Sequence, residues 1–209
     1  LFVRDNDNAT ANATFNVTVR NLAPTCKITT DEQEVSEDVE LTFEGTGKDT
    51  PTDLRSLQFR WDFGDGNLSE WMAEPAAAHT YAQKGLYVST LTVRDNDGAE
   101  SRAKVEITVN NMPPIAKAKA SKTSVDEDMP VIFNSSGSTD TLSDLPLLQY
   151  SWDFGDGKSA EGPLANHSYT KQKSYTVVLT VTDNDGASAT AELTIKSSNV
   201  APTVKASVD

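Results

Sequence analysis

Acidic and amide side chains recur at matching positions in this 209-residue chain, and together they could bind a metal ion. Carboxylate and amide oxygens without thiols or imidazoles suit Ca²⁺, which takes about six to eight oxygen ligands. Plain turns are the alternative, because Asp-Asn-Asp-Gly forms a hairpin turn without metal. The candidate ligands are Asp49, Asp53, Asp95, Asn96 and Asp97 near Asn21, and Asp140, Asp144, Asp183, Asn184 and Asp185 near Asn111. Their recurrence favours structural calcium.

A repeated hexapeptide, Trp-Asp-Phe-Gly-Asp-Gly at residues 61–66 and 152–157, places two carboxylates beside glycines. Such a pair could act in acid–base catalysis, but a catalytic pair is expected once per enzyme rather than once per repeat. Period two instead directs the tryptophan and phenylalanine into a core, and Asp-Gly closes a turn. We interpret the hexapeptide as structural.

The two histidines, His79 and His167, each stand two residues before a tyrosine. No serine or cysteine motif for a nucleophile accompanies them, and neither has a second histidine with which to bind zinc. We expect hydrogen-bonded structural histidines and no enzymatic activity.

Three motifs recur at intervals of about 90 residues, which predicts a tandem array. The hexapeptide returns after 91 residues, Asp-Asn-Asp occurs at residues 5–7, 95–97 and 183–185, and Asn-x-x-Pro occurs at 21–24, 111–114 and 199–202. We predict complete domains at residues 21–110 and 111–198. Residues 1–20 would contain the C-terminal strands of a preceding repeat and 199–209 the first strand of a following one. The chain is therefore expected to be a segment of a longer protein.

Alternating polar and apolar residues predict β-strands throughout, whereas helix signals are weak. Gly, Asp, Asn and Pro separate these runs, a pattern typical of an all-β sandwich. Strands are expected at residues 39–43, 57–63, 87–93 and 103–109 of the first repeat, and at 131–133, 148–154, 175–181 and 189–195 of the second.

The combined motifs resemble the polycystic kidney disease (PKD) domain. In the second repeat they are Gly-Ser-Thr-Asp at 137–140, the hexapeptide, His-Ser-Tyr at 167–169 and the strand at 175–183; the first matches at 61–66, 79–81 and 87–95. The resemblance implies tandem immunoglobulin-like β-sandwiches of an extracellular or cell-surface protein. Residues 50–52 and 141–143 lengthen the acidic loop relative to the family's compact Asp-x-Asp-Gly.

In an immunoglobulin-like topology the acidic loops lie together at the end of the sandwich that receives the incoming linker. Further acids at Glu37 and Asp38, and at Glu127 and Asp128, follow the first strand at the opposite end. In a head-to-tail array that end meets the next repeat's acidic loops. We therefore add these four residues to the candidate ligands and predict that cations stiffen the junctions.

The net charge of −13, without a basic cluster in the sequence, argues against binding nucleic acid or an anionic membrane. We also expect no direct insertion of this segment into a membrane. The single cysteine, Cys26, has no internal disulfide partner and aligns with Ala116, so we interpret it as a small buried side chain.

Asn-x-Ser/Thr sequons would accept N-linked glycans in an exported protein made by a glycosylating host. Asn8, Asn12 and Asn16 are spaced four apart, so on one strand they would share a face. Coincidence in a Thr-rich β-protein is the alternative. The six sequons are at Asn8, Asn12, Asn16, Asn67, Asn134 and Asn166.

These features predict a non-enzymatic extracellular module, a calcium-stiffened spacer, stalk, filament or surface-layer (S-layer) element whose partners are neighbouring repeats or copies of itself. One alternative is an accessory segment of a secreted protease, chitinase or collagenase. The other is an adhesion or ligand-binding module, for which Trp71, present in the first repeat only, is the conspicuous candidate.

Overall fold

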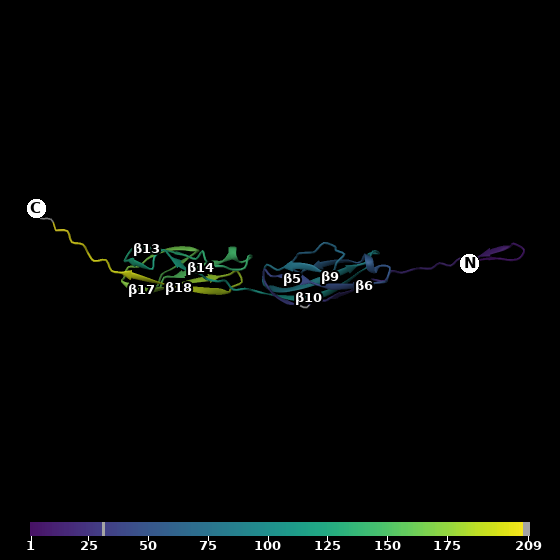
Figure 1. Ribbon diagram of the computed structural model, residues 1–209, viewed down its shortest axis with the longest axis horizontal. Helices are drawn as coiled ribbons and strands as arrows, with labels where there is room; N and C mark the ends of the chain where they lie inside the picture. Colours follow the sequence, from purple (N-terminus) through teal and green to yellow (C-terminus); the bar gives the residue numbers. More distant parts are fainter. Residues whose placement is uncertain (31, 207–209) are drawn as a thin grey trace.

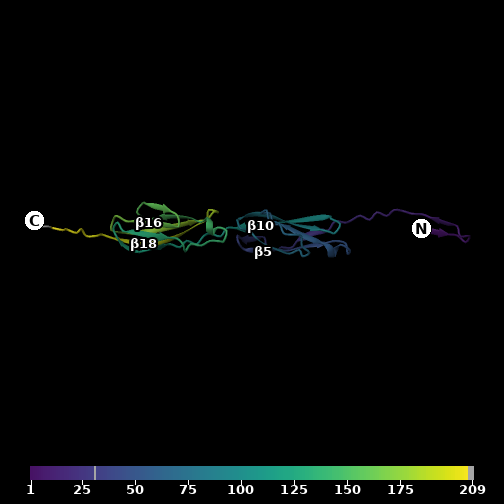
Figure 2. The same cartoon turned by 90° about the horizontal axis from the view of Figure 1, so that it is seen from above.

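The computed structural model describes residues 1–30 and 32–206 and consists of two β-sandwiches in line along its long axis (Figures 1 and 2). Its helices are two three-residue 3₁₀ helices, η1 (Leu54–Ser56) and η2 (Leu145–Leu147). None of the helices among the described residues is long or apolar enough to cross a membrane. The predicted all-β, immunoglobulin-like class is confirmed.

The first sandwich packs a four-stranded sheet against two strand pairs. The sheet runs in the order β4 (Glu34–Ser36), β10 (Glu100–Asn110), β9 (Gly85–Arg94) and β7 (Gln58–Asp62). The pairs are β3 (Thr25–Ile28) with β6 (Gly45–Lys48), and β5 (Glu40–Phe43) with β8 (Ala77–Thr80). Apart from a few residues at their ends, β5, β7, β9 and β10 are the predicted strands, whereas β3, β4, β6 and β8 were not predicted.

The second sandwich has the same plan with more continuous sheets. One sheet runs β12 (Ser124–Asp126), β18 (Ser188–Ser198), β17 (Lys173–Thr182), β14 (Gln149–Asp153) and β15 (Ser159–Glu161). The other runs β11 (Lys119–Ala120), β13 (Pro130–Asn134) and β16 (Leu164–Ser168). The predicted strands of this repeat are likewise present.

One parallel pairing decides where the acidic residues after β4 lie. β4 pairs in parallel with β10, whereas β9 pairs with β10 in the antiparallel sense. Parallel neighbours end at the same edge of a sheet. Glu37 therefore emerges beside the end of β10, where its amide donates to the carbonyl of Asn110 at 3.0 Å. Glu127 and Ser198 make the same contact at 2.9 Å in the second domain.

The tryptophan of each hexapeptide lies at the centre of its core. Trp61 and Trp152 are fully buried, and their indole N–H groups donate to the carbonyls of Pro75 at 2.9 Å and Gly162 at 3.1 Å. A buried tryptophan ring contributes a large apolar area to the core, and its polar N–H usually finds a hydrogen-bond partner there. The structural interpretation of these aromatic residues is confirmed.

The histidines are held by the second aspartate of the hexapeptide. The His79 ring nitrogen Nε2 lies 2.7 Å from Asp65 Oδ2, and the ring stacks on Phe63 with centroids 4.1 Å apart. His167 repeats the arrangement with Asp156 at 2.9 Å. Burial alone would raise the pKa of Asp65, but hydrogen bonds from Asn67 and His79 outweigh it and hold the pKa below its ordinary value. Hydrogen-bonded histidines are thus confirmed.

The chain ends differ from the predicted strands. Residues 1–20 contain a hairpin of β1 (Phe2–Arg4) and β2 (Thr10–Asn12), and residues 13–20 form no strand. Asn8 lies in the turn at φ 71°, so the prediction that Asn8, Asn12 and Asn16 share one strand is wrong. Residues 199–206 likewise form no strand, because nothing pairs with them, and residues 207–209 lie outside the described part.

Candidate metal centre at the domain junction

Four loops meet where the two sandwiches join. The first domain contributes the turn between β4 and β5, with Glu37 and Asp38, and the turn between β8 and β9, with Gln83 and Lys84. The second contributes the loop at residues 140–144 and the β17–β18 turn at residues 183–187. The acidic ends that the repeat pattern placed opposite each other are in contact here.

Side chains bridge the two domains directly. Asp38 Oδ2 accepts the amide of Ser143 at 2.8 Å and its hydroxyl at 2.9 Å. Gln83 donates to Asp144 Oδ1 at 3.1 Å and accepts the side-chain amide of Asn184 at 2.7 Å. These contacts use both the donor and the acceptor of Gln83, so they define one relative orientation of the loops.

Lys84 adds a charge contact at the rim. Its Nζ donates to the main-chain carbonyl of Asp185 at 2.7 Å and lies 3.5 Å from Asp185 Oδ1. The lysine side chain is 45% exposed and the Asp185 side chain 12%. Lys84 therefore neutralises part of the junction's negative charge from the solvent side.

Three carboxylates converge inside this junction. Glu37, Asp144 and Asp185 each offer one oxygen, and these oxygens lie within 4.8 Å of one another. Glu37 is 1% exposed and Asp144 is 0% exposed. Within residues 1–30 and 32–206, no second group of three acidic, histidine or cysteine side chains is this compact.

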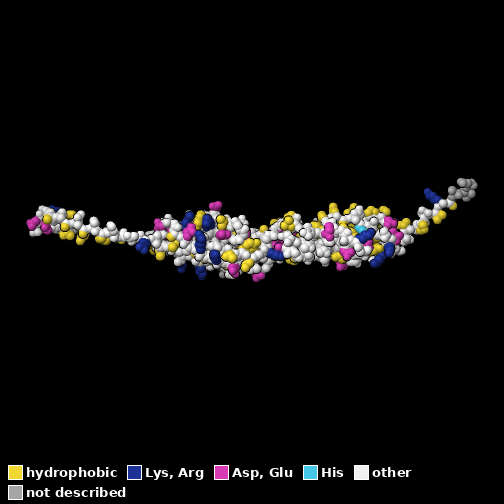
Figure 3. Space-filling view, turned by 180° about the vertical axis from the view of Figure 1, so that it is seen from behind, with side chains coloured by type: hydrophobic (Ala, Val, Ile, Leu, Met, Phe, Trp, Pro, Cys, Tyr) yellow, Lys and Arg dark blue, Asp and Glu magenta, His cyan; other side chains and the backbone are white. Residues whose placement is uncertain are grey.

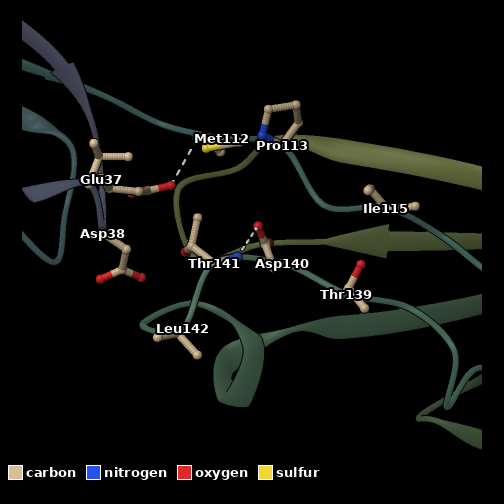
Figure 4. A pocket seen from close by; sticks show the side chains of 10 residues that line it. Glu37, Asp38, Met112, Pro113, Ile115, Thr139, Asp140, Thr141 and Leu142 are labelled. Carbon is tan, nitrogen blue, oxygen red and sulfur yellow. Dashed lines mark hydrogen bonds between the residues drawn. The ribbon is translucent and has the colours of Figure 1, made fainter.

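Several oxygens of the cluster have no hydrogen-bond partner. Glu37 Oε1 accepts the amide of Met112 at 2.8 Å (Figure 4), but its Oε2 is buried and unpaired. Asp144 Oδ2, Asp185 Oδ2 and the neighbouring Asp140 Oδ2 are also buried without a partner. An unpaired buried carboxylate oxygen is costly, so the arrangement favours a cation or a proton.

The cluster perturbs its own protonation. Burial first, and then the charges of Asp144 and Asp185, raise the pKa of Glu37 to about 7, against the stabilising hydrogen bond from Met112. Burial also raises the pKa of Asp140, helped by the charges of Asp144, Asp183 and Asp185 and opposed by the amide of Thr141. Carboxylates with raised pKa values at one place need either protons or a cation to neutralise them.

Two of the predicted metal ligands, Asp95 and Asp183, use their carboxylate oxygens to accept hydrogen bonds from amides of their own turns. Asp183 Oδ1 accepts the amides of Asp185 at 2.9 Å and Ala187 at 2.8 Å, while its Oδ2 accepts the Asn111 side-chain amide at 2.9 Å. Asp95 makes the equivalent bonds, including one of 2.7 Å from Asn21. These aspartates stiffen the turns and tie each incoming linker to its own domain.

The remaining predicted ligands are more scattered. In the first domain Asp53 accepts the Thr50 hydroxyl at 2.7 Å, Asp49 keeps one buried unpaired oxygen, and Asn96 and Asp97 are exposed. These residues form no compact group of three. Glu127 and Asp128 stand at the far end of the second domain, where Asp128 has φ 64°, close to the 58° of Asp38.

No sequence motif marks Gln83, Lys84 and Ser143, which make most of the direct contacts between the domains. Each lies in a polar turn or loop of ordinary composition. Only the docked structure reveals their partners.

Trp71 proves to be a local packing residue. Its ring lies under the guanidinium groups of Arg94 at 4.0 Å and Arg60 at 4.8 Å. The sheet register places Arg60 and Arg102 on either side of Thr92, and Figure 3 shows Lys and Arg side chains gathered on the first sandwich. Basic residues that form no cluster along the sequence therefore meet on this sheet.

The fold and the junction define a protein built of tandem immunoglobulin-like β-sandwiches joined end to end. The chain belongs to the PKD domain family, whose model, described as "PKD domain", matches residues 21–109 and 111–197. This confirms the resemblance seen in the sequence motifs.

Relatives with known names share parts of their length with this chain. A mouse protein named "Dyslexia-associated protein KIAA0319-like protein" is 29% identical over 210 residues, covering 91% of this chain and 20% of that protein. The "Pre-pro-metalloprotease PrtV" of Vibrio cholerae is 37% identical over 91 residues, covering 44% of this chain and 9% of that protein. The chain thus spans a fifth or less of these relatives.

Solved structures include the PKD1 domain of Vibrio anguillarum Epp, which is 30% identical and has a TM-score of 0.37. That comparison covers 44% of this chain and all of the Epp domain.

Proposed function

We propose that the chain is a non-enzymatic spacer of an extracellular or cell-surface protein, in which two PKD domains stand end to end in a fixed orientation. Membership of the PKD family supports the extracellular setting. Two contacts carry the proposal: Asp38 accepts hydrogen bonds from Ser143 of the second domain, and Gln83 donates one to Asp144, which together fix the orientation of one sandwich on the next.

The linker supports a stiff joint. The side chain of Asn111 donates to Asp183 in the second domain, and the amide of the next residue, Met112, donates to Glu37 in the first. Pro113 and Pro114 follow, and the ring of each fixes its own φ. A linker held on both sides leaves few torsions free to bend.

Measurement of residual dipolar couplings tests whether the two domains keep one fixed relative orientation. We expect both domains of the chain, measured in the presence of CaCl₂, to report one shared alignment tensor. A variant with a Gly-Ser insertion after Pro113 supplies the reference for uncoupled domains. Separate tensors in the unmodified chain would contradict the proposal.

A second candidate is an accessory segment of a secreted hydrolase. The relatives named PrtV and "Collagenase ColA" of Clostridium perfringens, the latter 33% identical over 99 residues, favour it. A catalytic domain in the same parent polypeptide would support this role. An isolated chain that increases hydrolysis of a fibrous substrate by a separately supplied protease would do the same.

The roles of stalk, filament and surface-layer element differ from one another in whether copies of the chain associate. Sedimentation at rising concentration distinguishes these arrangements. The sequon residues Asn67 and Asn166 are exposed, which supports glycosylation if the host provides it, and intact-mass measurement before and after glycosidase treatment tests this.

A further inference from the structure

We infer that the junction binds one Ca²⁺ ion between the two domains, held by Glu37 from the first and by Asp144 and Asp185 from the second. The inference rests on the proposed spacer function, since the ion would regulate the stiffness of that joint. A site shared in this way exists only while the two sandwiches are docked.

The size of the cluster fits a single ion. Two oxygens bound to one Ca²⁺ at about 2.3–2.6 Å can be at most about 5 Å apart. The three carboxylate oxygens lie within 4.8 Å of one another, a separation compatible with one ion bound by all three.

Unsatisfied oxygens inside the cluster are the second, independent observation. Glu37 Oε2 and Asp144 Oδ2 have no hydrogen-bond partner although both side chains are at most 1% exposed. Asp185 Oδ2 is unpaired as well. A bound cation would replace the water that these oxygens have lost.

The existing positive charge does not fill this role. Lys84 contacts Asp185 from the rim, and its side chain is 45% exposed. Its Nζ donates to the main-chain carbonyl of Asp185, and none of the buried unpaired oxygens accepts from it. Part of the negative charge inside the junction therefore remains uncompensated.

The donor chemistry selects among cations. All three ligands are carboxylates, which disfavours zinc and copper sites built on imidazole or thiolate. They come from three separate loops, and Ca²⁺ tolerates irregular geometry, whereas Mg²⁺ demands a near-ideal octahedron at about 2.0–2.1 Å. Water and the neighbouring Asp140 can complete the shell.

Ligands from both domains couple binding to docking. An ion that binds only the docked state stabilises that state, and docking raises the affinity for the ion by the same factor. Glu37 is the decisive ligand, because without it the site contains side chains of the second domain alone.

Calorimetric titration of CaCl₂ into the chelator-stripped full chain tests the inference. We expect Glu37→Gln to weaken calcium binding at the junction by about tenfold or more, because it removes a charged ligand. The matched control is Glu127→Gln at the equivalent position of the second domain, which should leave binding unchanged. Asp185→Asn, at the less buried edge of the cluster, should reproduce the loss if Glu37→Gln fails to fold.

The outcomes separate this inference from the spacer proposal. Wild-type affinity and stoichiometry in folded Glu37→Gln and Asp185→Asn would overturn the shared site. If the two domains share one alignment tensor but the chain binds no calcium, the inferred calcium site is wrong and the spacer proposal stands. Calcium binding that depends on Glu37 in a chain whose domains still align separately would refute the stiff spacer, while retaining the site.

Discussion

Glu37 Oε1 accepts the backbone amide of Met112 at 2.8 Å, which ties a loop of the first PKD domain to the linker that leads into the second. The residue before Met112, Asn111, donates to Asp183 of the second domain at 2.9 Å. Adjacent linker residues are thus anchored to opposite domains. The orientation of the joint is set by these buried contacts rather than by the covalent chain alone.

Gln83 should control the stiffness of the joint. Gln83→Ala removes a hydrogen bond to Asp144 and one from Asn184, which together stabilise docking by about 1–2 kcal/mol. We expect a broader distribution of domain orientations in solution scattering, with unchanged melting of each domain. Lys171→Ala, in the corresponding turn at the far end of the second domain, is the control; equal broadening in both variants would contradict the assignment.

Docking without calcium should weaken as the pH rises. The pKa of Glu37 is about 7 in the docked state, above its ordinary 4.5, because of burial and then the charges of Asp144 and Asp185 in the second domain, so docking favours the protonated form of Glu37. The favourable contribution is complete below about pH 4.5 and disappears as the pH rises through about 7, a change of up to about 3 kcal/mol.

Domain alignment measured in EDTA between pH 5 and pH 8 checks this. Glu37→Gln should flatten the dependence on pH, and saturating Ca²⁺ should reverse the loss at high pH if the shared site exists. Alignment that stays constant across this range in the unmodified chain would rule out a titrating Glu37.

Replacing a core tryptophan should unfold one domain selectively. Trp61→Ala deletes a fully buried ring and leaves the Pro75 carbonyl without its donor, at a cost of about 3–5 kcal/mol. Calorimetry should show a lower melting temperature for the first domain and an almost unchanged second transition. Trp71→Ala serves as the comparison, because it loses only partly exposed cation–π contacts of about 1 kcal/mol.

The two glycines of the first hexapeptide should differ in tolerance. Gly64 and Gly66 both have positive φ, 84° and 96°, so alanine strains the backbone at either site by about 1 kcal/mol. A Cβ on Gly64 would also lie 2.7 Å from the carbonyl oxygen of Val88, whereas one on Gly66 meets nothing within 4 Å. Gly64→Ala should therefore destabilise the domain more in denaturant unfolding; equal losses would contradict the role of the close approach.

The repeated motifs and the period-two alternation were enough to predict the sandwich, eight of its strands and its core aromatic residues. These features are local: a strand exposes alternate faces, and Asp-Gly or Asn-Asp-Gly favours a turn wherever it occurs. At the chain ends, β1 and β2 form a hairpin, whereas residues 13–20 and 199–206 form no strand, since a β-strand needs a partner that local sequence does not supply.

The sequence by itself determined that two PKD domains follow each other and that acidic loops recur at their ends. Only the tertiary structure decided which acids meet: Asp95 and Asp183 cap turns, whereas Glu37 joins Asp144 and Asp185 across the junction. The physical reason is that convergence depends on the parallel pairing of β4 with β10 and on the docking of two domains. These are long-range contacts, which a local pattern of residue types does not encode.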